Sequence, residues 1–315
     1  MIEAIDQATL QFDRDRLTLL NAILGLVMFG VALDLRPADF RRVANNGRAA
    51  IGGLGCQFLL LPAITFALVS LFEPPPSVAL GMFLVAACPG GTTSNFMTHL
   101  AGGHTALSVS LSAISTVAAT VMTPANLAFW ASLYPPTRQL LREVAVDPMA
   151  LALVVATILG VPIVLGMVVA ARWPALAMKL RRPLRWLSIL IFFGFVLAAL
   201  LANLEAFKSH VGQVAGLVFA HNSLALLIGY GVGWLLRLVE RDRRALSIEV
   251  GIQNSALGLV LVFDFFHGLG GMTLIVAWWG VWHLVSGLGL ALVWSRRPAW
   301  SRKSAGSERP TGGPS

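Results

Sequence analysis

The sequence predicts an all-α membrane protein with about nine transmembrane helices. Of its 315 residues, 57% are hydrophobic and 12% are charged, whereas an ordinary soluble domain has about 25% charged residues. The mean hydropathy of the chain is +0.76, and its apolar residues form blocks of roughly 20, the length that one helical span requires. The blocks are apolar on every face, unlike the alternating strands of a membrane barrel. Helices are therefore expected, since each satisfies its own backbone in lipid.

Nine apolar segments follow one another, separated by short polar or charged stretches. They cover residues 17–35, 49–72, 78–100, 105–132, 148–170, 186–206, 212–236, 245–266 and 272–294. Residues 1–16 form a polar N-terminus that is too acidic for a signal peptide or a transit peptide. Residues 295–315 are basic and rich in Ser, Gly and Pro, so we expect a disordered tail. The sequence thus predicts one transmembrane domain over residues 17–294.

The basic residues are distributed unevenly between the two sides that nine spans create. Eighteen of the 23 Lys and Arg follow the first, fifth, seventh and ninth segments, and five lie on the opposite side. Cytoplasmic loops carry the excess of Lys and Arg. We therefore predict a multi-pass protein of the cell membrane, inner or plasma, with its N-terminus outside and its C-terminus in the cytoplasm. Because loop positions account for the net charge of +8, the lipid bilayer is an expected partner and nucleic acid is not.

Two of the nine segments are interrupted by residues that disfavour a continuous helix. The third contains the run 87–95, Ala-Cys-Pro-Gly-Gly-Thr-Thr-Ser-Asn, and the eighth contains the run 249–255, Glu-Val-Gly-Ile-Gln-Asn-Ser. Proline removes a backbone donor and clashes with the preceding turn. Irregular backbone at membrane depth is tolerated only where it is buried in protein or lines a cavity. Two such segments, about 155 residues apart in corresponding halves, favour a transporter site at the interruptions.

Glu249 is a carboxylate in the middle of an apolar segment. A charge at that depth costs about 2.5–3.5 kcal/mol on insertion scales, and no Lys or Arg is expected at a comparable depth to neutralise it. We therefore predict that Glu249 binds a cation. The alternative is a protonated or water-solvated carboxyl group on an internal face.

Oxygen-bearing side chains that a hard cation would bind lie close together in the sequence. They are Ser94, Asn95, Ser108 and Ser112. Ser108 and Ser112 are four residues apart, so they share one helix face. The alternative for each hydroxyl is a hydrogen bond to the backbone carbonyl four residues earlier.

Several short motifs occur in order along the chain. They are Met28-Phe29-Gly30, Leu35-Arg36-Pro37-Ala38-Asp39-Phe40, Cys88-Pro89-Gly90-Gly91-Thr92-Thr93-Ser94-Asn95, Ala106-Leu107-Ser108, Ser247-Ile248-Glu249-Val250-Gly251-Ile252-Gln253-Asn254-Ser255 and Val281-Trp282-His283. In these motifs, over residues 20–295, the chain resembles the bile acid:sodium symporter family.

The resemblance implies a fold related to the sodium/proton antiporters. Two inverted repeats would form a core domain, about residues 49–132 and 212–294, and a panel domain, about residues 17–35 and 148–206. Two broken helices would cross in the core. The chain resembles the nine-span type of the family, in agreement with the segments counted above.

The resemblance also implies two sodium sites that share Glu249. Ser94, Asn95, Ser108 and Ser112 match the first site, with Ser112 where the family often has Thr. The second is matched by Gln57, Gln253 and the backbone carbonyls of Val250 and Ile252. Unwound carbonyls and the C-terminal ends of half-helices suit cations.

An organic anion would require donors in place of acceptors. The N-terminal ends of half-helices provide free N–H groups and the positive end of the helix dipole. The resemblance places Thr92, Asn254 and His283 beside these ends, with Leu284 where related bile-acid-binding proteins often carry Asn. For His283, a structural role with a bond to a carbonyl group is an equal alternative.

Together, these features predict a secondary active transporter, a sodium symporter of a small organic anion that works by alternating access. Bile acid-like, pantoate-like and keto acids are all candidate substrates. Sodium is the expected coupling ion, with no other cofactor and no transition metal. The alternatives are a proton-coupled or uncoupled organic anion carrier and a non-transporting membrane sensor. Zinc-ligand pairs, nucleophile elbows and Ser/His/Asp groupings are missing from the sequence, so an enzyme is not expected.

Overall fold

The computed structural model describes residues 47–143, 148–181 and 204–296, with isolated residues between 22 and 33 and between 183 and 194. The polar N-terminus, the motif at 35–40, most of the sixth apolar segment and nearly all of the tail lie outside the described residues. The helices are α4 (Gly47–Gly55), α5 (Leu61–Phe72), α6 (Pro76–Ala87), α7 (Thr93–Leu100), α8 (Thr105–Leu133), α9 (Pro135–Glu143), α10 (Pro148–Val155), α11 (Val161–Arg172), α13 (Leu204–Leu235), α14 (Glu240–Gly251), α15 (Ser255–Phe266) and α16 (Gly270–Ser295).

The described helices are those of a multi-pass membrane protein. Five are long and apolar enough to cross a membrane: Gly47–Phe72, Thr105–Leu133, Met149–Arg172, Val214–Leu235 and Gly270–Ser295. The first and third of these contain short π-helical turns, Cys56–Leu60 and Ala156–Gly160, that join α4 to α5 and α10 to α11. All five coincide with predicted apolar segments.

The third and eighth predicted segments each consist of two shorter helices. α6 ends at Ala87 and α7 begins at Thr93, while α14 ends at Gly251 and α15 begins at Ser255. Both interruptions therefore lie where the proline, glycine and hydroxyl residues predicted them.

The helices differ from the predicted segments by more than a few residues in three places. The seventh segment was expected to begin at residue 212, but α13 begins at Leu204. The eighth segment was expected to begin at residue 245, but α14 begins at Glu240. Hydropathy indicates which residues lie in the apolar part of the membrane, and it does not indicate where a helix begins. Glu and Arg are good helix formers, so the helix extends beyond the apolar segment into its charged flank. The helix α9 lies in a stretch, 133–147, that no apolar segment covers, because its residues are mainly polar.

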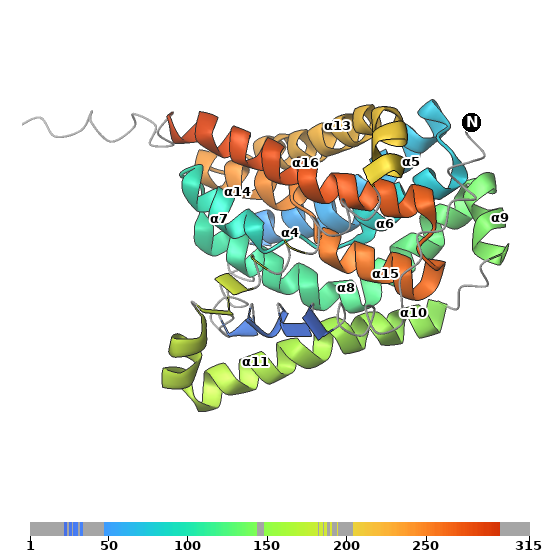
Figure 1. Ribbon diagram of the computed structural model, residues 1–315. Coiled ribbons are helices and arrows are strands. Elements are labelled where there is room, and N and C mark those ends of the chain that lie inside the picture. The colour runs from blue at the N-terminus through green and yellow to red at the C-terminus, as the bar shows by residue number, and fades with distance from the viewer. Residues whose placement is uncertain are drawn as a thin grey trace, which may run out of the picture.

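The core of the molecule is built around α6. Every residue of α6 from Ser77 to Ala87 is buried, and α5, α8 and α16 pack against it (Figure 1). α6 and α16 can approach each other closely because residue 81 is glycine. A β-carbon at this position would stand 2.2 Å from Cγ2 of Ile275, on α16. On the other side, α13 lies along α14, where Gly229 meets the backbone of Leu246.

The rod formed by α10 and α11 lies along one side of this core, at the bottom of Figure 1. Its residue Gly166 packs against Ala32 and the backbone of Phe29, from the first apolar segment. Arg181, just beyond the rod, donates from Nε to the carbonyl oxygen of Leu33 at 2.9 Å. These contacts join the two chain regions that the predicted panel domain would contain, while the division into core and panel remains a prediction.

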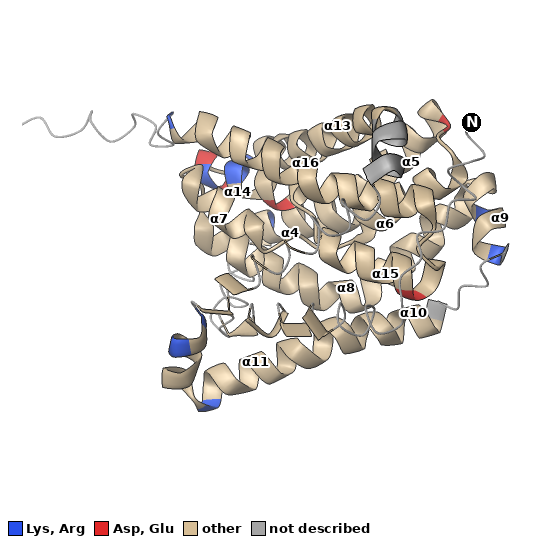
Figure 2. Ribbon diagram, in the orientation of Figure 1, with Lys and Arg blue, Asp and Glu red and all other residues tan. Residues whose placement is uncertain are grey.

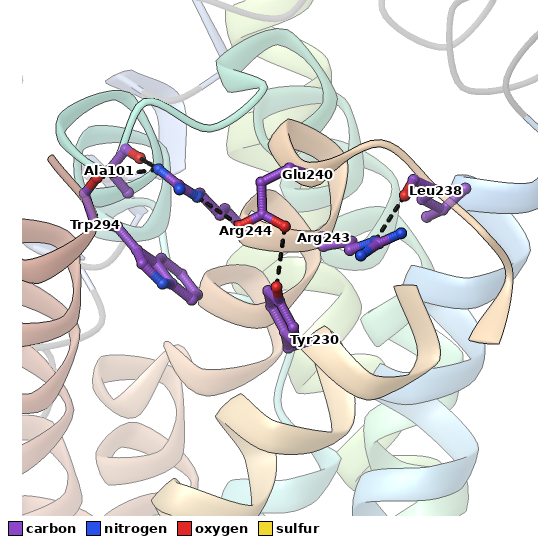
Figure 3. A network of polar contacts seen from close by, with 7 residues as sticks. All are labelled: Ala101, Tyr230, Leu238, Glu240, Arg243, Arg244 and Trp294. Carbon is purple, nitrogen blue, oxygen red and sulfur yellow. Dashed lines mark hydrogen bonds and ion pairs between the residues drawn. The ribbon is translucent and has the colours of Figure 1, made fainter. Parts of the chain in front are cut away.

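Charged residues lie mainly near the ends of the helices, around α14 at one end and α9 at the other (Figure 2). At the first end, Arg244 is a buried cation whose guanidinium ties three helices together (Figure 3). Its Nη1 donates to the carbonyl oxygens of Ala101, at the end of α7, and Trp294, near the end of α16, at 2.8 and 3.1 Å. Its Nε donates to Glu240 at 2.9 Å, so burial of this cation is compensated by a carboxylate and two carbonyl dipoles.

Candidate functional site

The two interruptions meet inside the core. Gly90 and Gln253 form an antiparallel β-bridge. The N–H of Gly91 donates to the carbonyl oxygen of Ile252 at 2.6 Å, and the N–H of Asn254 donates to that of Pro89 at 2.9 Å. The two extended stretches thus satisfy part of each other's backbone, which unwound chain at membrane depth requires.

Glu249 lies beside this crossing, with its side chain 3% exposed. Its Oε2 accepts hydrogen bonds from the hydroxyls of Ser94 at 2.7 Å and Ser108 at 3.1 Å, and its Oε1 accepts one from Ser112 at 2.7 Å. Asn95 Oδ1 lies 2.8 Å from Ser108 Oγ and 3.3 Å from Ser112 Oγ. The structure therefore brings together all five residues predicted for the first cation site.

These five residues come from three helices that are far apart in the sequence. Ser94 and Asn95 lie in the first turn of α7, Ser108 and Ser112 lie one turn apart on α8, and Glu249 is near the C-terminal end of α14. The position at the N-terminal end of α7 favours a negative charge through the helix dipole. Three hydroxyl groups thus donate to the carboxylate, and their oxygens and that of Asn95 still have lone pairs that a cation could bind.

The second predicted group surrounds the two glutamine side chains. Gln57, in the π-helical turn, donates from Nε2 to the carbonyl oxygen of Cys88 at 2.7 Å and to Gln253 Oε1 at 2.8 Å. Gln253 donates from Nε2 to the carbonyl oxygen of Val250 at 2.6 Å. The carbonyl oxygen of Ile252 accepts a hydrogen bond from the N–H of Gly91, so this predicted ligand also takes part in the crossing. Gln57 therefore contacts both interruptions, at Cys88 and at Gln253, while Val250 and Ile252 belong to the second one.

The half-helix ends arrange opposite dipoles around the crossing. α6 and α14 bring their C-terminal ends to it, and α7 and α15 begin there. Terminal carbonyl oxygens therefore lie near the crossing at the ends of two helices, and the positive dipole ends of two others lie there too. In these two helix starts, the N–H groups of Ser94, Asn95 and Ser255 already donate to the carbonyl oxygens of Gly91, Thr92 and Gln253. This arrangement has a region suited to cations and a region suited to an anion at short range.

The three residues predicted for the anion are at or beside the helix starts. Thr92 immediately precedes α7, and Asn254 immediately precedes α15, where its Oδ1 accepts a hydrogen bond from the N–H of Leu257 at 3.1 Å. His283, on α16, is buried, and its Nδ1 lies 3.3 Å from the hydroxyl of Ser255. In the described part of the chain, no hydrogen bond joins these three side chains to one another.

Several buried polar residues at the crossing were not predicted. Thr123, on α8, donates to the carbonyl oxygen of Ala87, the last residue of α6, at 2.7 Å. Asn222, on α13, donates to the carbonyl oxygen of Gly251, the last residue of α14, at 2.8 Å. A polar residue in an apolar span is a signal that could have drawn attention to Asn222. Its partners, however, lie in other segments, and no local sequence pattern indicates them.

Comparison with known proteins agrees with the resemblance in the sequence motifs. Residues 21–210 match the model of the Sodium Bile acid symporter family. The chain is 32% identical, over 92% of its length and 86% of the relative's, to the uncharacterized sodium-dependent transporter YocS of Bacillus subtilis.

Two further relatives come from a plant and a mammal. One is the probable sodium/metabolite cotransporter BASS1, chloroplastic, of Arabidopsis thaliana, 30% identical over 87% of this chain and 66% of the relative. The other is the sodium-dependent organic anion transporter of Bos taurus, 25% identical over 83% of this chain and 73% of the relative.

Proposed function

This chain belongs to the sodium bile acid symporter family, and we propose that it is a sodium-coupled symporter of a small organic anion. The family and the relatives are transporters, not enzymes. The relatives' names describe sodium-dependent transport, in one case of organic anions. The coupling ion, the class of substrate and the symport direction are the parts we propose for this protein.

The environment of the Glu249 carboxylate is the observation that most directly supports the proposal. A buried carboxylate at membrane depth requires a cation, a proton or a set of donors. Here three serine hydroxyls and the oxygen of Asn95 surround it, and hard cations prefer such uncharged and carboxylate oxygens over nitrogen and sulfur. We infer that Ser94, Asn95, Ser108, Ser112 and Glu249 bind one sodium ion.

A second sodium ion would bind between Gln57, Gln253 and the carbonyl oxygens of Val250 and Ile252. The two carboxamides already contact each other, and rotation of a carboxamide exchanges its nitrogen for its oxygen at one position. The C-terminal end of α14 adds the negative end of a dipole. This group lies directly beside Glu249 in the chain, so both ions would share the neutralising carboxylate.

The anion would bind at the N-terminal ends of α7 and α15, near Thr92, Asn254 and His283. These side chains are neutral donors, so backbone N–H groups and helix dipoles would neutralise the anion. Leu284, next to His283, presents an apolar surface. A small monocarboxylate with some apolar body fits this surrounding better than a dianionic or highly hydroxylated compound. Sodium and anion would attract each other at short range in a poorly screened cavity.

Proton coupling is the nearest alternative mechanism, because a buried carboxyl group also takes up protons. A proton relay through the membrane usually contains a chain of carboxylates or histidines. In the part of the chain that the structure describes, the side chains in contact with Glu249 are serine hydroxyls. This favours an ion held by oxygen ligands. The polypeptide would lie in the cell membrane with its C-terminus in the cytoplasm, as the loop charges predict.

A thermal-shift screen on the purified protein tests the proposal. A ligand that binds only the folded state raises the apparent melting temperature. Pantoate, pyruvate and cholate would each be measured in sodium chloride and in potassium chloride of equal ionic strength. We expect at least one of these anions to stabilise the protein, and to do so more strongly in sodium. Stabilisation that is the same in both salts for every anion would contradict sodium coupling, and stabilisation by none would contradict the substrate class.

A further inference from the structure

Asn222 lies in the middle of α13, and its side chain is fully buried. Both ends of its carboxamide are used: Nδ2 donates to the carbonyl oxygen of Gly251 at 2.8 Å, and Oδ1 accepts from the hydroxyl of Ser286, on α16, at 2.6 Å. A polar side chain inside an apolar span is costly unless it is paired. Asn222 therefore joins α14 to α16 through one hydrogen bond at each end of its carboxamide.

On the first side, Asn222 holds the end of the half-helix that carries the candidate cation ligands. Gly251 is the last residue of α14, two residues after Glu249 and one after Val250. The last carbonyl groups of a helix have no partner within the helix, and Asn222 supplies one here. Gly251 also packs against Leu226 of α13, because a β-carbon at 251 would stand 2.2 Å from Cδ2 of that leucine. A shift of the end of α14 would therefore be transmitted to α13.

On the second side, Asn222 contacts the helix that carries the candidate anion residue. Ser286 lies one turn after His283, and its hydroxyl is also 3.3 Å from the carbonyl oxygen of that histidine. The imidazole of His283 lies in turn beside the hydroxyl of Ser255, the first residue of α15. The polar contacts thus continue from Gly251 to the start of the half-helix at which the anion would bind.

We propose that Asn222 is a positioning residue that couples the sodium sites to the anion site, through Gly251 on one side and Ser286 on the other. The inference rests on the proposed function. Sodium bound to Glu249 and the carbonyl oxygen of Val250 fixes the end of α14, and the carboxamide of Asn222 follows the carbonyl group of Gly251. Ser286 moves with the carboxamide and orients the turn that carries His283. Neither Asn222 nor Ser286 binds sodium or the anion itself.

The contact between Asn222 and Gly251 can be compared with that of Gln57 at the first interruption, residues 87–95. Gln57 makes the same kind of contact there, donating to the carbonyl oxygen of Cys88. Its carboxamide continues to Gln253, within the candidate cation site. The carboxamide of Asn222 instead continues to α16 and away from that site. Of Gln57 and Asn222, Asn222 is therefore the one whose carboxamide connects a half-helix end at the crossing with α16.

Coupling is measured as the ratio of the anion's Kd in potassium to its Kd in sodium, at equal ionic strength, for pantoate, pyruvate and cholate. Coupling between two ligands in proteins commonly changes affinity by about 5–150-fold. We expect Ser286→Ala and Asn222→Ala to reduce the wild-type ratio to near one. The Kd for sodium, measured without an anion, should stay within about twofold of wild type, since coupling and intrinsic affinity are separate quantities.

Ser247→Ala is the matched control, because Ser247 is a buried serine that joins α14 to α13 without reaching α16. Its hydroxyl donates to the carbonyl oxygen of Leu226 at 2.7 Å. This variant should keep the wild-type ratio. A Ser286→Ala protein that keeps the ratio, or that loses sodium affinity as strongly as coupling, would overturn the inference even if Asn222→Ala fails to fold. If wild-type protein itself shows a ratio of one, the proposed function is wrong, and the inference is wrong with it.

Discussion

Gly90 lies directly against the carboxylate of Glu249. A β-carbon at position 90 would stand 2.3 Å from Oε1 and 2.9 Å from Cδ of Glu249, and 3.3 Å from its carbonyl oxygen. Three serine hydroxyls hold that carboxylate from its other sides, so it has little room to move. Glycine is required at this position by the close approach of the Glu249 carboxylate, and not by an unusual backbone dihedral angle.

Gly90→Ala should therefore displace the Glu249 carboxylate and weaken sodium binding by an order of magnitude or more, about 1.4 kcal/mol or above. The measurement is the sodium concentration that gives half of the maximal increase in melting temperature. Gly55→Ala is a suitable control, since a β-carbon there would meet nothing within 4 Å. If both alanine variants respond to sodium like wild type, the carboxylate is not the ligand.

Glu249→Gln keeps the shape of the side chain but removes its charge. The variant should fold and enter the membrane, because the amide can still form hydrogen bonds with neighbouring hydroxyls, but its melting temperature should not rise with sodium. Glu73→Gln, at the exposed C-terminal cap of α5, should respond as wild type does. A normal sodium response in Glu249→Gln would refute the assignment of both sodium sites.

Gln57 and Gln253 should act as one unit, because their carboxamides bond to each other. Each single alanine variant should raise the sodium concentration needed for half-maximal stabilisation, and the double variant should raise it little more than either one. Residues in direct contact show such non-additive effects, whereas independent residues do not. Fully additive effects in this double-mutant cycle would mean that the glutamines do not share an ion.

Arg244→Ala should lower the free energy of unfolding by about 1–3 kcal/mol, since it removes the donor to the carbonyl oxygens of Ala101 and Trp294 and to the partly exposed Glu240. The loss should appear as a lower melting temperature, while the sodium-induced increase is kept. Arg241→Ala changes an exposed neighbour and should have little effect. Loss of the sodium response in Arg244→Ala alone would show that this end of α14 belongs to the ion site.

The distribution of Lys and Arg predicts that Ser315 is in the cytoplasm and that α9 is outside. A reporter fused after Ser315 should be active only inside the cell, and an epitope inserted between residues 143 and 148 should be reached by antibody from outside. External activity of the C-terminal fusion would refute the nine-span arrangement.

Most of the candidate cation site could be predicted because its residues carry local signals. Glu249 is a charge in an apolar segment, and Ser108 and Ser112 share a face because they are four residues apart. Each signal depends only on the chemistry and spacing of residues in one segment. The structure then adds the fact that these segments meet, which periodicity alone does not determine.

Asn222 and the start of α14 could not be predicted in the same way. The role of Asn222 depends on Gly251 and Ser286, which lie 29 and 64 residues away, and no local pattern joins them. Hydropathy placed the start of α14 too late, because charged residues end a membrane segment without ending a helix. Tertiary contacts and helix propensity decide these features.

The hydrogen bonds of the Arg244 guanidinium have a mechanical consequence for a membrane transporter. The guanidinium fastens the ends of α7 and α16 to α14 at one point, so none of the three can slide lengthwise without breaking a charge-assisted bond in a buried place. The candidate ion ligands on α7 and α14 would therefore move together. Exposure of the candidate site first to one side of the membrane and then to the other would require α7, α14 and α16 to move as one unit relative to α6, α8 and α13, which pack against them.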